Sequence, residues 1–294
     1  MSPASPCVGT CKLDDATGWC LGCARSGDEI AEWRAGTDAW RAAVWNALPA
    51  RFERLGVSCR RLPWETLDIR NFVLRSLRGA EGTWVVGVVG AVAEFTARPG
   101  GSVEVDADGT SIIARTEGGR LRFRIDDDVR ALTFDPLETP PERQRLVLAV
   151  KRERGRLPVS GIIADLGEDR AAIDAGDRVA HLFDLGLGRK EARFCVRCTP
   201  GAALDALMSA AGSAMHMALP RIGPTLVEDS PVRVVESALG RIEVSGPIPP
   251  PGGASPAGPH THLLPDHLAT GRALPAGMDV PRAYLPGAIF YPAG

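Results

Sequence analysis

The sequence predicts an α+β protein in which a small metal-stapled helical N-terminal module is followed by a mainly antiparallel sheet domain with a few helices. Three observations predict this class. Four cysteines lie within residues 7–23, apolar residues recur at helical spacing up to about residue 58, and from Gly82 short strand-like runs alternate with turn residues. The chain has 294 residues, 45% of them hydrophobic, so it can bury a core of ordinary size.

We expect three parts. Residues 1–58 form a four-cysteine metal-binding helical module, residues 59–66 form a linker, and residues 67–294 form an α+β domain with a segment rich in proline and glycine near its end. The module is too small to rely on its core alone, and a bound metal is a common remedy.

Helix start signals organise the module. Ser26 and Glu29 form a capping-box pattern that begins a short helix, and Thr37 can cap a second helix to about Leu55, with a kink or break at Pro49. The second helix has an apolar face at helical spacing: Trp40, Val44, Leu48 and Phe52.

Alternation and glycine turns dominate the larger domain after a third helix over Trp64–Leu77. The predicted strands are Thr83–Val89, Ala91–Ala97, Ser102–Val105, Ser111–Arg115, Arg120–Ile125, Arg145–Lys151, Val159–Ala164, Val179–Leu185, Ala192–Arg197, Val232–Val235 and Arg241–Val244. A helix is expected over Pro200–Ala211. Pro247–Pro259 predicts an irregular connector, and the proline-rich and glycine-rich residues after it are expected to wrap the surface.

Composition excludes several classes of partner. The formal charge of −2 gives no long-range attraction to nucleic acid, and the most apolar window is too short to span a membrane. The first residues show no signal peptide, so we expect a cytoplasmic protein, where thiols stay reduced and cysteine clusters favour metal over disulfides. A protein partner is possible, and the sequence leaves the oligomeric state open.

The spacing Cys7-x3-Cys11-x8-Cys20-x2-Cys23 supplies two short-spaced thiol pairs that can converge on one tetrahedral centre. Thiolate ligands suit zinc and iron–sulfur clusters alike, so the cofactor is expected to be zinc or an iron–sulfur cluster. Because the protein supplies all four ligands, a zinc site here would be closed and structural.

The same segment resembles the YdhL-like family of small bacterial proteins, a domain of unknown function whose members are described as predicted iron–sulfur proteins. The resemblance covers roughly residues 3–55 and includes all four cysteines. It is carried by the residues Pro6 to Cys11, Asp14, Asp15, Gly18 to Cys23, Arg25, Glu29, Ile30 and Trp33. Ala24 stands where the family usually has glycine and Ser26 where it usually has threonine. The resemblance implies a cluster or metal at the cysteines.

The remainder resembles an uncharacterised bacterial family through three short motifs, which are Phe183 to Gly188, Gly240 to Glu243, and the GPHTHLLP run Gly258 to Pro265. This resemblance implies a domain and no reaction.

Three of the five histidines, His260, His262 and His267, lie within eight residues. In an extended segment His260 and His262 point the same way, which would suit a second metal site or catalysis. The opposing interpretation is that they serve as hydrogen-bond anchors in a loop.

Of the remaining cysteines, Cys195 and Cys198 lie in a predicted strand and face opposite ways, which favours two structural thiols over a redox pair. Cys59 is most simply a packing residue.

We therefore expect a metal-binding protein whose four-cysteine site is a structural or interaction module. The alternative is a metal-dependent enzyme or a metal- or cofactor-handling protein at the His260-Thr261-His262 loop. A redox sensor would require an iron–sulfur cluster.

Overall fold

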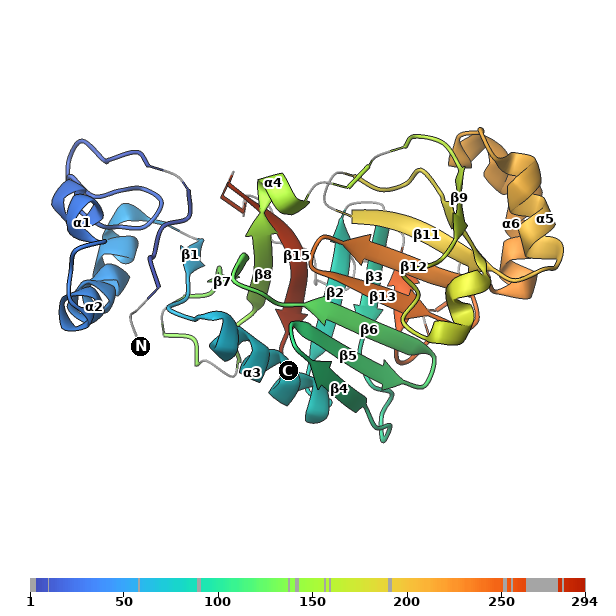
Figure 1. The fold of residues 1–294 in the computed structure, drawn as a ribbon, viewed down its shortest axis with the longest axis horizontal. Helices are drawn as coiled ribbons and strands as arrows, with labels where there is room; N and C mark the ends of the chain where they lie inside the picture. The colour runs from blue at the N-terminus through green and yellow to red at the C-terminus, as the bar shows by residue number, and fades with distance from the viewer. Residues whose placement is uncertain are drawn as a thin grey trace.

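The computed structural model describes residues 4–9, 11–57, 59–88, 91–136, 138–140, 143–155, 157–158, 160–189, 192–250, 253–254, 256–262, 280–281 and 283–293. Figure 1 shows a small helical module at the N-terminal end, drawn in blue, beside a larger body of two β-sheets. The predicted α+β class is confirmed, and the strand pairs are antiparallel.

Two helices build the module, α1 (Gly27–Glu32) and α2 (Asp38–Leu55). The predicted capping box begins α1, because the Ser26 hydroxyl accepts from the Glu29 N–H while the Glu29 carboxylate accepts from the Ser26 N–H. Helix α2 continues through Pro49, where the sequence predicted a kink or break, and ends at Gly56 with φ 62°. Buried residues on both sides of that proline hold its two halves to one cluster: Val44, Leu48 and Phe52.

Within the described residues, one sheet has seven strands in the order β1-β7-β8-β15-β2-β3-β14. Its strands are β1 (Arg60–Arg61), β2 (Thr83–Val88), β3 (Ala91–Phe95), β7 (Val129–Thr133), β8 (Leu146–Lys151), β14 (His260–His262) and β15 (Tyr284–Tyr291). We call it the first sheet.

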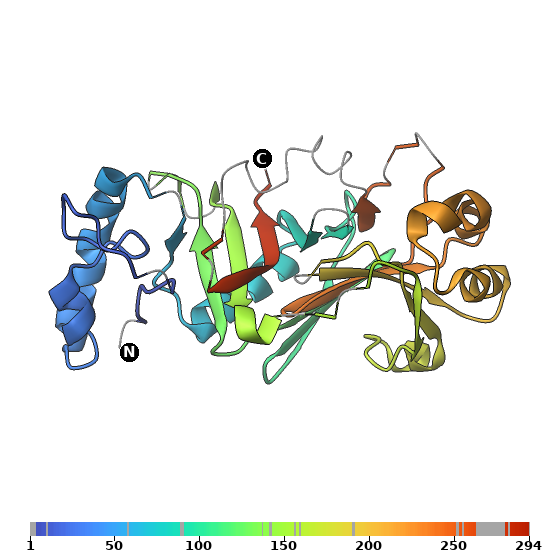
Figure 2. The same ribbon diagram turned by 90° about the horizontal axis from the view of Figure 1, so that it is seen from above.

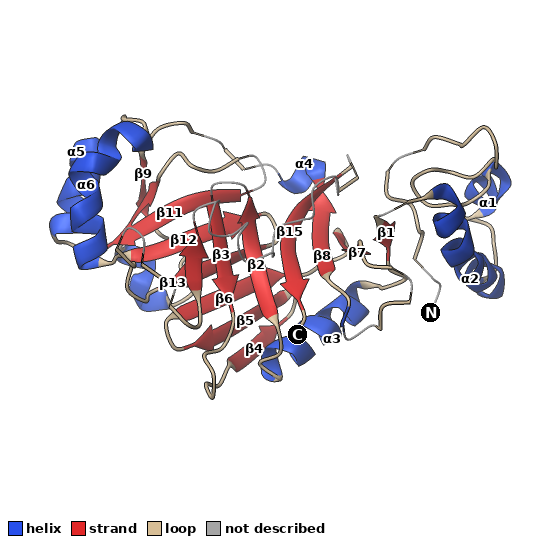
Figure 3. Ribbon diagram, turned by 180° about the vertical axis from the view of Figure 1, so that it is seen from behind, coloured by secondary structure: helices blue, strands red, loops and turns tan. Residues whose placement is uncertain are grey.

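The second sheet has eight strands in the order β4-β5-β6-β13-β12-β11-β10-β9. Its strands are β4 (Glu104–Asp108), β5 (Ser111–Thr116), β6 (Gly119–Arg124), β9 (Ala164–Glu168), β10 (His181–Asp184), β11 (Ala192–Cys198), β12 (Val232–Ser237) and β13 (Gly240–Val244). Seen from behind, β2 and β3 of the first sheet cross in front of the second (Figure 3).

The main core lies between the two sheets. Trp84 on β2 and Phe123 on β6 are both fully buried, with ring centroids 5.0 Å apart. Helix α3 (Thr66–Arg78) packs on this core through one face: Ile69, Val73 and Leu77. Along each strand, side chains alternate between this core and the outer face of the sheet. The outer face of the second sheet can therefore hold polar and charged side chains.

Four further helical elements complete the described fold: α4 (Arg152–Gly155), the 3₁₀ turn η2 (Ala175–Val179), α5 (Ala202–Ala210) and α6 (Met215–Asp229). Helices α5 and α6 lie at the end of the molecule opposite the N-terminal module (Figure 2). In the described parts of the chain no helix is long and apolar enough to cross a membrane.

Two elements differ from the prediction because their prolines suggested irregular structure. Helix α6 was not predicted, since Pro220 and Pro224 lie inside it, but both prolines face solvent while Ala218, Ile222 and Leu226 are buried. Of the residues expected to wrap the surface after the proline-rich connector, Tyr284–Tyr291 instead form β15, which pairs with both β8 and β2, whereas residues 263–279 lie outside the described ranges. Strand β7 was also not predicted; it pairs with β1.

Candidate metal centre

A tight turn between Leu13 and Cys20 presents the last two cysteines of the module. Asp14 accepts hydrogen bonds from the Thr17 N–H at 2.9 Å and the Thr17 hydroxyl at 2.7 Å, which hold the pKa of Asp14 below its ordinary value. Gly18, with φ 71°, donates its N–H to the Asp14 carbonyl at 2.8 Å. Leu13 and Cys20 then meet in an antiparallel bridge, so the turn ends at a metal-ligand candidate.

Cys20 and Cys23 share a second turn, closed by N–H donation from Cys23 and Ala24 to the Cys20 carbonyl at 3.2 and 2.7 Å. Ala24 adopts φ 56°, a left-handed conformation that explains why the family it resembles usually has glycine there. The two thiols contact each other, and the N–H groups of Gly22 and Lys12 also donate to the Cys20 sulfur. Burial opposes ionisation of Cys20, but these donors outweigh it and lower its pKa.

Cys7 and Cys11 form the other pair. The Gly9 N–H donates to Cys7 Sγ at 3.3 Å, and the Cys11 thiol contacts the Cys7 thiol. The charge of Cys7, then burial, then the charge of Cys20 raise the pKa of Cys11. A charge interaction between Cys11 and Cys20 relates this pair to the pair of Cys20 and Cys23.

In the described ranges no group of three or more His, Cys, Asp or Glu side chains is arranged to hold a metal ion. The four thiols are two contacting pairs rather than a closed shell around one point. The donor set nonetheless suits a soft metal or a cluster, because it offers four thiol sulfurs with backbone N–H groups directed at them.

Two buried arginines lie beside the cysteines. Arg25 is 3% exposed, donates from Nε to Cys23 Sγ at 3.4 Å, and lies over the Trp33 ring at 4.7 Å. Burial raises the pKa of Cys23, an effect that Arg25 opposes. Arg61, on β1, is 7% exposed; burial lowers its pKa to about 10, and the charge of Cys7 opposes that lowering. Positive charge therefore accompanies the thiols of Cys7 and Cys23.

The cysteine loop is docked on the outer face of the first sheet. Val8 is buried in a cluster with residues of β7, β8 and β15, and a Cβ placed on Gly9 would lie 2.2 Å from the Cβ of Ala283. Trp45 of α2 donates its indole N–H to the Ala4 carbonyl at 2.8 Å. The loop is thus held by its own helices on one side and by the sheet on the other.

The predicted histidine site is only partly described. His260 is buried on β14, with Nδ1 2.7 Å from the Gly258 carbonyl oxygen and Nε2 3.8 Å from Glu94 Oε2. The His262 backbone pairs with Val92, and His267 lies outside the described residues. Both ring nitrogens of His260 face groups of the fold, as expected of an anchor, and the enzyme alternative stays a prediction.

The other three cysteines are buried thiols. Burial raises the pKa of Cys59 and of Cys198 to about 12, and raises that of Cys195 as well. Cys195 packs in a cluster on one face of β11 and Cys198 in the main core on the other, as the strand prediction implied. Neither thiol has the lowered pKa of a redox cysteine.

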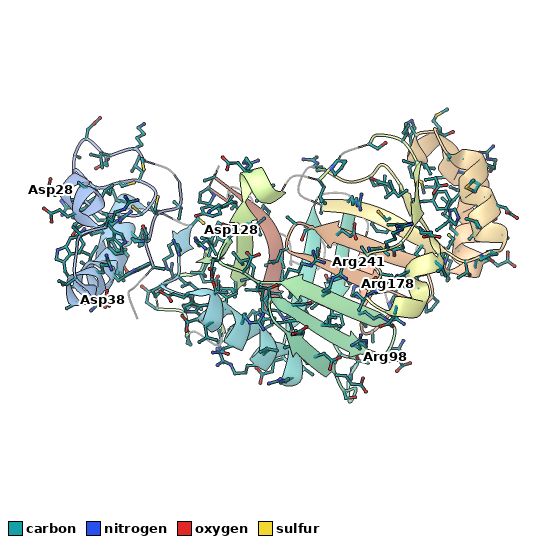
Figure 4. The ribbon with its side chains drawn as sticks, in the orientation of Figure 1. Asp28, Asp38, Arg98, Asp128, Arg178 and Arg241 are labelled. Carbon is teal, nitrogen blue, oxygen red and sulfur yellow. The ribbon has the colours of Figure 1, made fainter. Side chains whose placement is uncertain are left out.

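A buried ionic network on the outer face of the second sheet was not predicted. Arg241 on β13 is 1% exposed and pairs with Asp169, Glu236 and Glu243. Arg197 on β11 joins it through Asp169 at 3.2 Å and Glu243 at 3.0 Å. Figure 4 labels Arg241 among the strands of this sheet, far from the N-terminal module.

Comparison with protein families assigns the larger body. A family of unknown function, DUF6925, matches residues 68–294, more than half of the chain. The chain belongs to the DUF6925 family. A second model, a protein of unknown function designated DUF1289, matches residues 5–52, so a small N-terminal domain followed by an uncharacterised domain is confirmed. No curated protein and no solved structure matches the chain.

The two matched ranges leave residues 53–67 between them, and this interval contains Arg61. Arg61 belongs structurally to the sheet of the DUF6925 body, because β1 pairs with β7. The arginine that donates to the Ser5 carbonyl, two residues before Cys7, thus comes from outside the range of the DUF1289 match.

Proposed function

We propose that Cys7, Cys11, Cys20 and Cys23 bind one metal centre, a zinc ion or an iron–sulfur cluster, and that this centre is structural. It folds the N-terminal module and presents it to the DUF6925 body, so the module acts as an interaction element. The two contacting thiol pairs, related by the charge interaction of Cys11 with Cys20 and accompanied by Arg25 and Arg61, are the observation that supports this function.

Charge favours such a centre at this place. Four thiolates around one zinc ion leave two negative charges in excess, and a thiolate-bound cluster also carries negative charge. Two buried guanidinium groups, those of Arg25 and Arg61, lie where they can offset that excess. A reducing compartment such as the cytoplasm keeps all four thiols free for the metal.

The chain itself supplies the rest of the site. The N–H groups that donate to Cys7 and Cys20 stabilise the ionised sulfurs, and Arg25 stabilises Cys23. The protein fills all four positions, which leaves no open coordination site for a substrate. The geometry therefore supports a structural role over hydrolysis.

The test is metal analysis and a visible spectrum of protein purified with and without oxygen. One zinc per chain and no visible absorbance support the zinc form, whereas a brown protein with iron and sulfide supports the cluster. Cys20→Ser should lose the metal, while Cys195→Ala, which changes a buried thiol of the second sheet, should keep it. Metal-free protein in both preparations, or full metal content in Cys20→Ser, would overturn the proposal.

A further inference from the structure

A small pocket opens on the outer face of the second sheet, beside the turn that joins β12 to β13. Its volume is about 200 Å³, and it is lined by Arg122 and Arg124 of β6, by Leu157 and Ala171, and by residues 236–241. The turn is well ordered by its own contacts, since the Ser237 hydroxyl accepts the N–H groups of Leu239 and Gly240. The pocket lies beside this hairpin and outside the metal module.

The arginines of this face fall into two groups. Arg115 and Arg120, on β5 and β6, each pair with Asp174, at 3.1 and 2.5 Å. Arg241 pairs with three carboxylates. By contrast, Arg122 and Arg124 form no ion pair or hydrogen bond with any side chain in the described parts of the chain.

The carboxylate of Glu236, which lines the pocket, is already engaged. Glu236 accepts from Arg193 at 2.8 Å through one oxygen and from Arg241 through the other. Arg122 lies directly across from Arg241 in the strand register, and Arg124 follows on the same face two residues later. Burial and the charges of Arg124 and Arg241 lower the pKa of Arg122, and the charges of Glu243 and Glu236 oppose that lowering only in part.

We propose that this pocket binds a compact oxyanion, a phosphate or a small carboxylate, through the guanidinium groups of Arg122 and Arg124. Two neighbouring guanidinium groups match the oxygens of such an anion with paired N–H donors. The anion supplies the negative charge that the other arginines of the face obtain from aspartate and glutamate. The volume suits a single small group and is below the range of typical organic ligand pockets.

Isothermal titration calorimetry and thermal unfolding of the full chain test the site, with inorganic phosphate in one arm and succinate in the other. Binding in one arm only identifies which oxyanion the pocket accepts. Arg122→Gln/Arg124→Gln should weaken that binding about tenfold or more, because it removes both charged donors. The matched control Arg78→Gln/Arg221→Gln removes two exposed arginines elsewhere and should bind like the natural chain.

A second measurement separates a ligand site from a structural role. Without ligand, Arg122→Gln/Arg124→Gln should unfold at the same temperature as the natural chain or higher, because burial and the repulsion from Arg124 and Arg241 outweigh the attraction of Arg122 to Glu243 and Glu236, and the substitution breaks no ion pair of the described residues. Lowered stability of the ligand-free variant would overturn the proposal, as would undiminished binding by that variant. Absence of binding to phosphate and succinate by the natural chain would also overturn it.

Discussion

The guanidinium of Arg61 donates a hydrogen bond to the carbonyl oxygen of Ser5 and so holds the chain two residues before Cys7. A residue of the first sheet thereby reaches into the cysteine module. Its neighbour Arg60 is equally buried but donates to the carbonyls of Asp135 and Pro136 instead. The adjacent pair forms a natural comparison for the proposed metal centre.

We predict that Arg61→Gln lowers metal affinity about 10- to 100-fold, as loss of an outer-shell partner typically does. Arg60→Gln should reduce stability to a similar degree while leaving the affinity unchanged. Competition with a chromogenic chelator measures the affinity of both variants. Equal affinities in Arg61→Gln and Arg60→Gln would show that Arg61 does not act on the centre.

Two glycines test how the module docks. Gly9 and Gly18 have similar φ values of 79° and 71°, so alanine at either one strains the backbone by about 1–3 kcal/mol. Only at Gly9 does the new methyl group meet the larger body, where it would lie 2.2 Å from the Cβ of Ala283, the residue before β15; at Gly18 nothing lies within 4 Å. Gly9→Ala should therefore make residues 53–62 cleavable by protease, and Gly18→Ala should not.

The protease comparison is made at equal metal content, measured on the same samples. If the two alanine variants are cleaved at equal rates, contact between the loop and the sheet does not hold the module in place.

Alkaline pH should destabilise the DUF6925 body through Cys198. Burial raises the pKa of Cys198 from 9.0 to about 12, so the folded state favours the neutral thiol. The resulting stability is fully present below the unfolded pKa of 9.0 and is lost as the pH rises through about 12, by about 1.4 kcal/mol for each pH step of one within that window. Urea unfolding at increasing alkaline pH should show a smaller loss in Cys198→Ala than in the natural chain.

Replacing Arg241, the centre of the ionic network, should lower the stability of the fold. Arg241→Leu removes the cation shared by three buried carboxylates and leaves only Arg197 and Arg193 beside them, so we expect a loss of about 3–5 kcal/mol in the free energy of unfolding. The exposed pair of Arg170 with Glu168, at 3.4 Å, supplies the control, because Arg170→Gln should cost less than about 1 kcal/mol. Chemical denaturation measures both, and similar losses would contradict the network's importance.

Sequence prediction succeeded where the interaction is local. The capping box of Ser26 and Glu29 spans three residues and appears in the structure as predicted. Cys20 and Cys23 lie close together because a short turn with backbone hydrogen bonds joins them, and their spacing in the sequence implies such a turn. The same local logic predicted most strands of the second sheet, because alternation and glycine turns are properties of adjacent residues.

Prediction failed where distant segments decide the outcome. Pro286 and Gly287 suggest a surface loop, but they lie at a register shift of β15, where the strand tolerates a missing donor. Arg241 and Glu243 alternate with apolar residues and so predict a strand with one charged face. The segment that contains Asp169 covers this face and buries its charges in a network. This burial depends on contacts between residues about 70 positions apart in the sequence.

Strand β15 has a consequence for how the protein comes to be folded. It joins β8 to β2, so before residues 284–291 are in place the first sheet is two separate pieces with unpaired edges. During synthesis those edges, and the apolar strands behind them, stay open until this late strand leaves the ribosome. The nascent chain is then most exposed to aggregation, and its dependence on chaperones should be greatest just before β15 emerges.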